Sequence, residues 1–223
     1  MKVGILGSGD VAKALAHGFL ATGHQVKLGT RDPKAGKLNE WAKSAGSHAS
    51  VGTFAETAGY GELVVIATRG TETVGILKGV GAEGFRGKVV IDVTNPLVFA
   101  ANAPPTLSVG YTDSLGEQVQ RALPGAHVVK AFNTVGNSNF FQPNFPGSGP
   151  DMFIGGNDAA AKKRVEEILH SFGWKGVVDL GGIDAARLLE MMCLVWVRAA
   201  MSLNSYEIAF KILRKEPAPG ASP

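Results

Sequence analysis

The first twelve residues carry a glycine pattern directly after an apolar run. Gly7, Gly9 and Ala12 stand in the spacing G-x-G-x-x-A, and residues 2–6 before them read as a strand. Such glycines permit a tight turn and let a diphosphate approach the backbone where a helix begins. The free N–H groups and the positive end of the helix dipole then bind the diphosphate. We therefore predict a dinucleotide-binding loop rather than a turn without a ligand, and its residues are Gly7, Ser8, Gly9, Asp10 and Val11.

The turn after the second apolar run carries the residues that would choose between NAD and NADP. In NAD binders an acidic residue about 20 positions beyond the glycines accepts hydrogen bonds from the adenosine ribose. This turn reads Thr30-Arg31-Asp32-Pro33-Lys34, so a hydroxyl and a guanidinium replace the carboxylate. Because a guanidinium binds phosphate strongly, Thr30, Arg31 and Lys34 predict NADP. If the strand ends one position later, Asp32 could hydrogen-bond to the ribose of NAD, so NAD remains an alternative. Otherwise Asp32 and Pro33 begin the next helix.

Three later apolar runs end in polar residues. The ends are Thr68 and Arg69, Asn95 and Pro96, and Asn133 and Thr134. Ligands of open α/β sheets bind beyond the carboxyl ends of the strands, so these side chains are candidates to contact the nicotinamide carboxamide. Each residue alone is weak evidence, because Asn-Pro is also an ordinary turn and an arginine there is often a surface charge.

A parallel sheet would bring these residues together, and the chain shows the pattern of one. Short β-branched apolar runs alternate with helix-length segments, which is typical of a doubly wound, Rossmann-type α/β fold. Strands are expected at 2–6, 25–29, 63–68, 88–93 and 126–131, with a weaker one at 48–51. Helices are expected at 11–21, 33–44 and 72–78, and a capping box of Ser114 and Glu117 predicts another up to residue 123.

The second part of the chain is expected to extend this domain. We assign residues 1–150 to the NADP-binding domain, 151–215 to a packed extension with a helical carboxyl-terminal region from 185, and 216–223 to a disordered tail. Apolar residues recur three and four apart in the helical region, which indicates a stripe that packs on the sheet or on a second subunit, and we expect a homodimer through these helices. A long loop at 133–150 precedes the extension, and its phenylalanines could stack on a planar ring or pack the loop down.

The composition excludes several classes of protein. Hydrophobic residues make up 45% of the 223 residues and charged residues 18%, which is typical of a globular chain with a sizeable core. A single cysteine, Cys193, favours a reducing compartment, and we expect the cytoplasm because neither a signal peptide nor a membrane-length apolar run is evident. Scattered basic residues and a net charge of +3 do not indicate a nucleic-acid partner, and the five isolated histidines do not indicate a metal site.

Several longer stretches resemble one family of reductases. Residues 4–12, 29–31, 90–97, 128–134, 153–158 and 184–190 are similar to the enzymes that pass hydride between NADP and the deazaflavin coenzyme called factor 420. The stretch at 128–134 is also similar to the NADPH-binding domains of six-transmembrane metalloreductases. The resemblance implies that the glycine loop, Thr30, Arg31 and the strand ends hold NADP. It also implies direct hydride transfer between two stacked rings, with no catalytic side chain assigned.

These observations together predict an NADPH-dependent oxidoreductase whose acceptor is a deazaflavin, a flavin or a similar planar compound. A hydroxy-acid dehydrogenase would need a proton donor, commonly a lysine or histidine, and the final helical region offers no lysine before Lys211. An imine reductase shares the opening motif. A non-catalytic NADP-binding sensor would have the same cofactor residues and no second substrate, so it remains an alternative.

Overall fold

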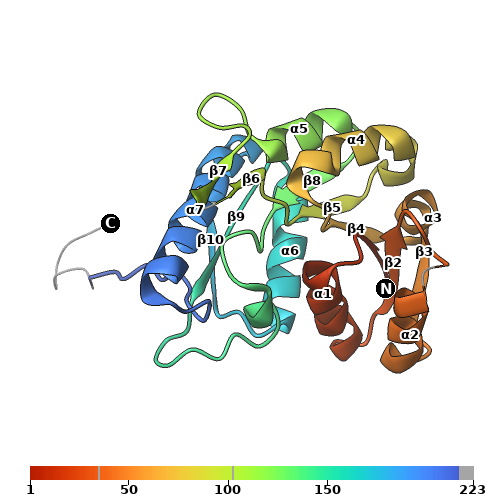
Figure 1. The fold of residues 1–223 in the computed structure, drawn as a ribbon, viewed down its shortest axis with the longest axis horizontal. Coiled ribbons are helices and arrows are strands. Elements are labelled where there is room, and N and C mark those ends of the chain that lie inside the picture. Colours follow the sequence, from red (N-terminus) through yellow and green to blue (C-terminus); the bar gives the residue numbers. More distant parts are fainter. Residues whose placement is uncertain (35, 102, 216–223) are drawn as a thin grey trace.

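One eight-stranded sheet forms the centre of the molecule (Figure 1). The computed structural model describes residues 1–34, 36–101 and 103–215, so the expected tail at 216–223 lies outside the described residues. The strand order is β10-β9-β8-β5-β4-β1-β2-β3, and all neighbouring strands run parallel except β8 and β9. The doubly wound α/β fold predicted from the sequence is confirmed.

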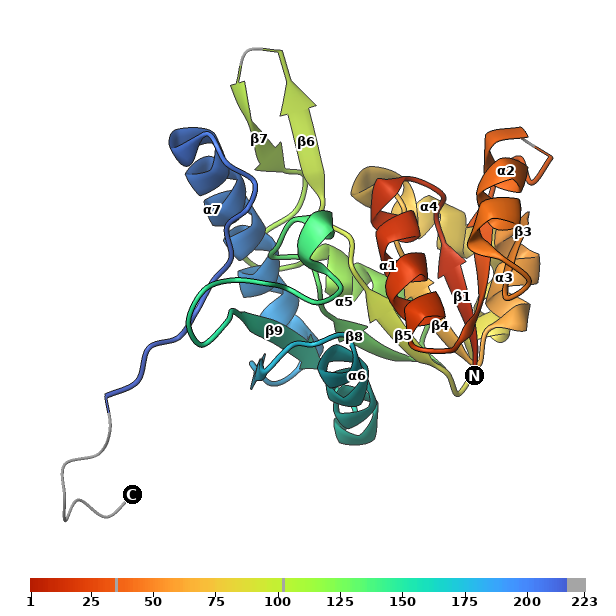
Figure 2. The same ribbon diagram turned by 90° about the horizontal axis from the view of Figure 1, so that it is seen from below.

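The elements follow one another in alternation along most of the chain. The strands of the sheet are β1 (Lys2–Leu6), β2 (Gln25–Thr30), β3 (Ala49–Thr53), β4 (Leu63–Ile66), β5 (Val89–Asp92), β8 (His127–Lys130), β9 (Asp151–Gly156) and β10 (Gly176–Asp179). The helices are α1 (Asp10–Ala21), α2 (Gly36–Ala45), α3 (Phe54–Tyr60), α4 (Gly70–Val80), α5 (Leu115–Ala122), α6 (Ala159–Ser171) and α7 (Ala186–Leu203). Strands β6 (Leu97–Ala100) and β7 (Ala103–Leu107) form a separate antiparallel hairpin, which stands beside α7 (Figure 2).

Helices cover both faces of the sheet because the inner strands are apolar on both sides. All four residues of β4 are buried, and so are four of the five in β1. One core cluster joins these strands to α1 and α6, through residues such as Phe19 and Ile168. The other joins them to α4 and α5, through Leu77 and Val119. The carboxyl ends of β1, β2 and β4 are therefore held at one rigid edge.

The final helix is shorter than the sequence predicts. It ends at Leu203, where Asn204 takes a left-handed conformation with φ 48°, as expected for a residue that closes a helix. Residues 205–212 instead run back along the body, to which Glu207, Ile208 and Ile212 are hydrogen-bonded. The backbone N–H of Asp151 donates to the Phe210 carbonyl at 2.9 Å, and the Asp151 carboxylate accepts from Lys211 Nζ at 2.7 Å. This largely buried carboxylate holds the segment in an extended course.

Helix α3 and the two strands of the β6–β7 hairpin were not predicted, and one predicted cap is only half formed. Helix α3 begins with a complete capping box of Thr53 and Glu56, a sequence signal that could have revealed it. The β6–β7 hairpin has prolines within β7 and no turn motif, so its sequence does not read as paired strands. At α5, Ser114 Oγ accepts from the Glu117 N–H at 3.1 Å, but the Glu117 carboxylate pairs with Arg187 instead of closing the box.

Candidate cofactor site

The turn between β1 and α1 has the backbone that the glycine motif predicts. Gly7 lies at φ 138°, and a Cβ there would collide with the Ala67 carbonyl oxygen, so no larger residue fits. A Cβ on Gly9 would meet no atom within 4 Å. No side chain caps the start of α1, where Gly9 is the N-cap residue. The first N–H groups of this helix therefore point outward without helical partners and form a ready site for an anion.

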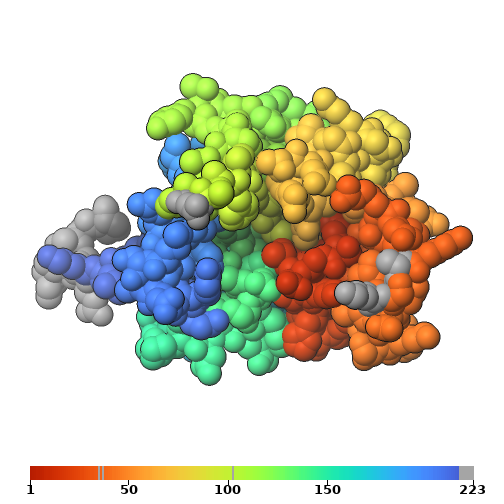
Figure 3. Space-filling view, viewed as in Figure 1, coloured from red at the N-terminus to blue at the C-terminus, as the bar shows by residue number. Residues whose placement is uncertain are grey.

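A cavity of about 410 Å³ lies next to this turn and joins three strand ends. Its lining includes seven of the residues predicted from the sequence: Gly7, Ser8, Gly9, Thr30, Arg31, Thr68 and Arg69. Four further residues complete it, which the sequence did not single out: Phe54, Ala67, Glu72 and Ile76. The surfaces of the segments that supply them adjoin in red, orange and yellow in the space-filling view (Figure 3). The register of three parallel strands thus brings together residues that are far apart in the sequence.

Two arginines, Arg31 and Arg69, line this cavity, and the carboxylate of Glu72 lies between them. Arg31 Nη2 is 3.6 Å from Glu72 Oε2, and Arg69 Nη1 is 3.8 Å from Glu72 Oε1. Both guanidinium side chains are more than three-quarters exposed, at 79% and 77%, so an incoming anion can reach them. The hydroxyl of Thr68 lies deeper and shares a hydrogen bond of 2.8 Å with the Thr73 hydroxyl.

The remaining residues of the two amino-terminal predictions lie near the cavity without lining it. Asp10 and Val11 open α1 and are exposed. Lys34 is exposed, and its backbone N–H donates to Asp32 Oδ1 at 3.0 Å. Asp32 therefore closes a local turn. The prediction that Asp32 and Pro33 begin the next helix is wrong, because α2 starts at Gly36.

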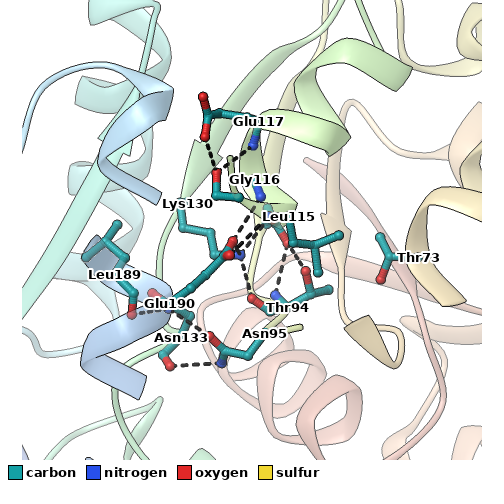
Figure 4. Close-up of polar contacts among 12 residues, drawn as sticks. Thr73, Thr94, Asn95, Leu115, Gly116, Glu117, Lys130, Asn133, Leu189 and Glu190 are labelled. Atoms are coloured by element: carbon teal, nitrogen blue, oxygen red, sulfur yellow. Dashed lines mark hydrogen bonds and ion pairs between the residues drawn. The ribbon is translucent and has the colours of Figure 1, made fainter. Parts of the chain in front are cut away.

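The carboxyl ends of β5 and β8 meet through their asparagines (Figure 4). Asn95 Nδ2 donates to the Asn133 carbonyl at 3.0 Å, and Asn133 Nδ2 donates to Asn95 Oδ1 at 3.0 Å and to the Leu189 carbonyl at 2.9 Å. Asn133 is 4% exposed, yet its Oδ1 has no hydrogen-bond partner in the part of the chain that the structure describes. Pro96 and Thr134 are buried beside the pair. These four residues lie outside the lining of the 410 Å³ cavity, but a Cβ on Gly70 of α4 would overlap the Asn95 carbonyl oxygen, so the two regions are adjacent.

A buried charge network that the sequence did not predict lies behind these asparagines (Figure 4). Lys130 Nζ is 3.0 Å from Asp92 Oδ2 and 2.9 Å from Glu190 Oε1, and all three side chains are at most 1% exposed. The backbone N–H groups of Leu115 and Gly116, at the start of α5, donate to Glu190 at 3.0 and 2.9 Å. The network joins β5, β8, α5 and α7. Two features of the sequence could have revealed this network: Lys130 lies within an apolar strand, and Glu190 lies within an apolar helix.

The electrostatics of this network keep its lysine charged. Burial alone lowers the pKa of Lys130, but the charges of Asp92 and Glu190 outweigh burial and raise that pKa above its ordinary value. Burial also raises the pKa of the nearby Cys193 thiol to about 11. Cys193 is therefore protonated at neutral pH, as expected for an unreactive core thiol.

The residue before Asn133 adopts a strained backbone. Phe132 has φ 63°, which is rare for a bulky residue, and its ring is 1% exposed. It packs edge-on against Phe140 with ring centres 5.3 Å apart, and Phe141 packs in the same way on Phe172. The possibility that Phe140 and Phe141 stack on a planar ring, which the sequence left open, is therefore wrong. Both rings pack against other phenylalanines and hold the loop against the body. The strain is concentrated where a strand end meets the candidate site.

Neither a metal-binding cluster nor a membrane-spanning helix occurs within the described ranges 1–34, 36–101 and 103–215. Among these residues no group of three or more His, Cys, Asp or Glu side chains is arranged to hold a metal ion. In the same part of the chain, none of the helices has the length and apolar character needed to cross a membrane.

The parallel sheet, the uncapped glycine turn and the cavity across three strand ends define a Rossmann-type dinucleotide-binding protein. Residues 2–96 match the family described as NADP oxidoreductase, coenzyme F420-dependent. The chain belongs to this family of NADP-dependent oxidoreductases, which confirms the resemblance found in the sequence.

Named relatives agree with this assignment. The crystal structure of a candidate F420-dependent NADP reductase from Arthrobacter sp. FB24 is 42% identical and has a TM-score of 0.91, with 96% of this chain and 100% of that chain covered. The F420-dependent NADP reductase of Methanocaldococcus jannaschii is 29% identical over 85% of this chain and 88% of its own length. Metalloreductase STEAP3 of Rattus norvegicus is 30% identical over 85% of this chain, but the match spans only 36% of that protein.

Proposed function

We propose that this protein binds NADP(H) in the 410 Å³ cavity and passes hydride between its nicotinamide ring and a planar acceptor, a deazaflavin, a flavin or a similar compound. The observation that carries the proposal is the joint lining of that cavity by the glycine turn, Arg31 and Arg69. The residues fit the cofactor, because Gly9 leaves open space beside uncapped N–H groups and both guanidinium groups are exposed. When bound, NADPH supplies the hydride.

The adenosine end would be held by charge and the diphosphate by backbone. Arg31 can bind the 2′-phosphate through its planar fork of N–H donors, and Arg69 can approach from the opposite wall. Lys34 adds positive charge outside the cavity. The N–H groups of Asp10 and Val11, with the dipole of α1, would bind the diphosphate.

The nicotinamide end would be positioned by the asparagine pair. The buried Oδ1 of Asn133 lacks a partner, and an unsatisfied buried acceptor costs about 1–3 kcal/mol. The carboxamide N–H₂ of the cofactor is a donor that would satisfy it. Asn95 and the Leu189 carbonyl hold the Asn133 amide in place, so this side chain is fixed before a ligand arrives.

The exposed surface beside the asparagines supports a planar acceptor. The β6–β7 hairpin leaves the end of β5 directly after Asn95 and Pro96, and Val98 and Phe99 on it are 40% and 75% exposed. An apolar surface of this kind favours an aromatic ring system over a small charged substrate. The names of the M. jannaschii and Arthrobacter relatives favour the deazaflavin among the planar candidates.

The test is acceptor-dependent oxidation of NADPH by the purified protein under anaerobic conditions. Coenzyme F420, FMN, FAD and a ferric chelate are offered in turn, and NADPH is followed by its absorbance. We expect turnover with F420 or a flavin, and much slower turnover with NADH than with NADPH. Tight NADPH binding without turnover of any acceptor would contradict the enzyme proposal and favour the non-catalytic sensor.

We also propose that a second copy of the chain covers the outer face of α7. Leu189, Glu190, Cys193 and Ala200 face the protein's own core, whereas Leu188 and Val195 on the opposite side are 59% and 56% exposed. A helix that is apolar all round is normally buried on all sides. Met191, Met192 and Ala199 complete the outer stripe at helical spacing and are half-buried.

The outer stripe suits a two-fold contact between two α7 helices. A stable contact needs about 800 Å² from each partner, to which the stripe and the exposed end of α7 at Met201 and Leu203 can both contribute. Light scattering should give twice the chain mass of 23.2 kDa. The double variant Leu188→Lys/Val195→Lys should give the mass of one chain. The control Leu213→Lys, at an exposed residue beyond α7, should still give the mass of two chains. A parent of single mass would overturn the dimer.

A further inference from the structure

We propose that Glu72 limits the preference of this site for NADPH over NADH, because its carboxylate holds the Arg31 guanidinium in an ion pair with which the 2′-phosphate must compete. The proposal rests on the function proposed above and concerns the same cavity. Its basis is an acidic side chain in the cavity lining, Glu72, which was not singled out from the sequence.

The geometry places Glu72 between the two cations of the cavity. It lies in the first turn of α4, where the helix dipole favours a charged carboxylate. One of its oxygens is 3.6 Å from Arg31 and the other is 3.8 Å from Arg69. The cavity therefore presents two guanidinium groups whose charge is partly neutralised before any nucleotide arrives.

The two nucleotides differ in the group that meets this arrangement. A phosphate monoester carries a charge of about −1.5 to −2 at pH 7, so the 2′-phosphate of NADP competes with Glu72 for Arg31 and is repelled by its carboxylate. The adenosine ribose of NAD presents hydroxyl groups instead, which can donate to a carboxylate. In the turn after β2, Thr30 and Arg31 replace the acidic residue typical of NAD binders, and Asp32 closes a local turn. Glu72 supplies a carboxylate to the cavity from α4. Glu72 thus weakens NADPH binding without weakening NADH binding.

Glu72 can be replaced without threatening the fold. Its side chain is 39% exposed, and among the residues that the structure describes it forms two long ion pairs, both with exposed arginines. Exposed pairs contribute little to stability. Glu72→Gln keeps the shape and removes the charge. Glu62→Gln is the matched control, because Glu62 is exposed and lies before β4, at the opposite end of the strand from the cavity.

The experiment measures dissociation constants by calorimetry at low ionic strength for NADPH, NADH, 2′,5′-ADP and 5′-AMP. The last two report on the adenosine end alone. For Glu72→Gln we expect NADPH and 2′,5′-ADP to bind about two- to fivefold more tightly, the size set by an exposed ion pair. NADH and 5′-AMP should bind no more tightly than to the parent. This gain in affinity should be smaller at high salt, which screens the ion pair of Arg31 with Glu72. It should also be smaller in the Arg31→Gln background, where that ion pair is absent.

The outcomes separate this role from the proposed function. A parent that binds neither dinucleotide would overturn both. A parent that binds NADPH, combined with an unchanged or weaker affinity of Glu72→Gln for NADPH, would overturn only the role of Glu72. An equal gain for 2′,5′-ADP in Glu62→Gln would also overturn it, because the effect would then be one of net charge.

Discussion

Replacing Lys130 with methionine tests whether the buried network is held together by charge. The substitution keeps most of the side-chain length and leaves Asp92 and Glu190, which are 0% and 1% exposed, without a cation between them. Removing one partner of a buried ion pair costs about 3–5 kcal/mol, which for a chain of this size lowers Tm by roughly 6–20 °C. Both carboxylates keep backbone or hydroxyl donors, so we expect the lower half of that range.

The pH dependence of the loss gives the sharper test. In the parent, the raised pKa of Lys130 means that its stabilisation is complete at neutral pH and is lost only as pH rises through that value. In Lys130→Met this stabilisation is absent at every pH. The deficit in Tm should therefore be the same at pH 7 and pH 9, and should become smaller only as pH rises above about 10.5, where the parent begins to lose the charge of Lys130.

Differential scanning calorimetry of parent and variant across that pH range measures both effects. Arg86→Met is the control, since Arg86 and Glu83 form an exposed ion pair at 2.7 Å and such pairs contribute about 0–1 kcal/mol. A Tm of Lys130→Met within about 3 °C of the parent, or a deficit that differs between pH 7 and pH 9, would refute the reasoning.

Three further predictions concern the cofactor site and the cysteine. Arg31→Leu should weaken NADPH binding by about 10- to 150-fold, the worth of one charge-assisted hydrogen bond, and leave NADH binding nearly unchanged in the same titration. Gly9→Val should fold with the parent's Tm, because its Cβ position is open, yet lose NADPH binding; Gly7→Ala should lower Tm, because its Cβ would collide with the Ala67 carbonyl. A parent Tm for Gly7→Ala would contradict the described turn. Cys193, with a pKa of about 11, should resist iodoacetamide at pH 8 until the protein is unfolded, as followed by mass spectrometry.

The local features of the site could be predicted from the sequence because they depend on neighbouring residues. The glycine spacing fixes the turn after β1, where Gly7 needs a positive φ and Gly9 needs open space. Thr30 and Arg31 could also be predicted, because the second strand of a dinucleotide-binding unit ends about 20 residues beyond the glycine turn. Where local signals were overlooked, as with the capping box of α3, the information was present in the sequence.

Other features arise only when distant segments meet. Glu72 is an ordinary helix residue in the sequence and becomes part of the site because β2 and β4 both flank β1, which brings it within 3.6 Å of Arg31. Asn95 and Asn133 were each predicted to face a ligand, but the pairing of β5 with β8 joins their amides to each other and leaves one acceptor free.

The sequence by itself determined the alternation of strands and helices, the cofactor turn and the family, because periodicity, glycine sterics and motif spacing act over a few residues. The tertiary structure alone decided that α7 ends at Leu203, that Lys130 lies between Asp92 and Glu190, and that Glu72 shares a cavity with two arginines. The physical reason is that a hydrogen bond or an ion pair depends on distance in space, and strand order and register set that distance for residues far apart in the chain.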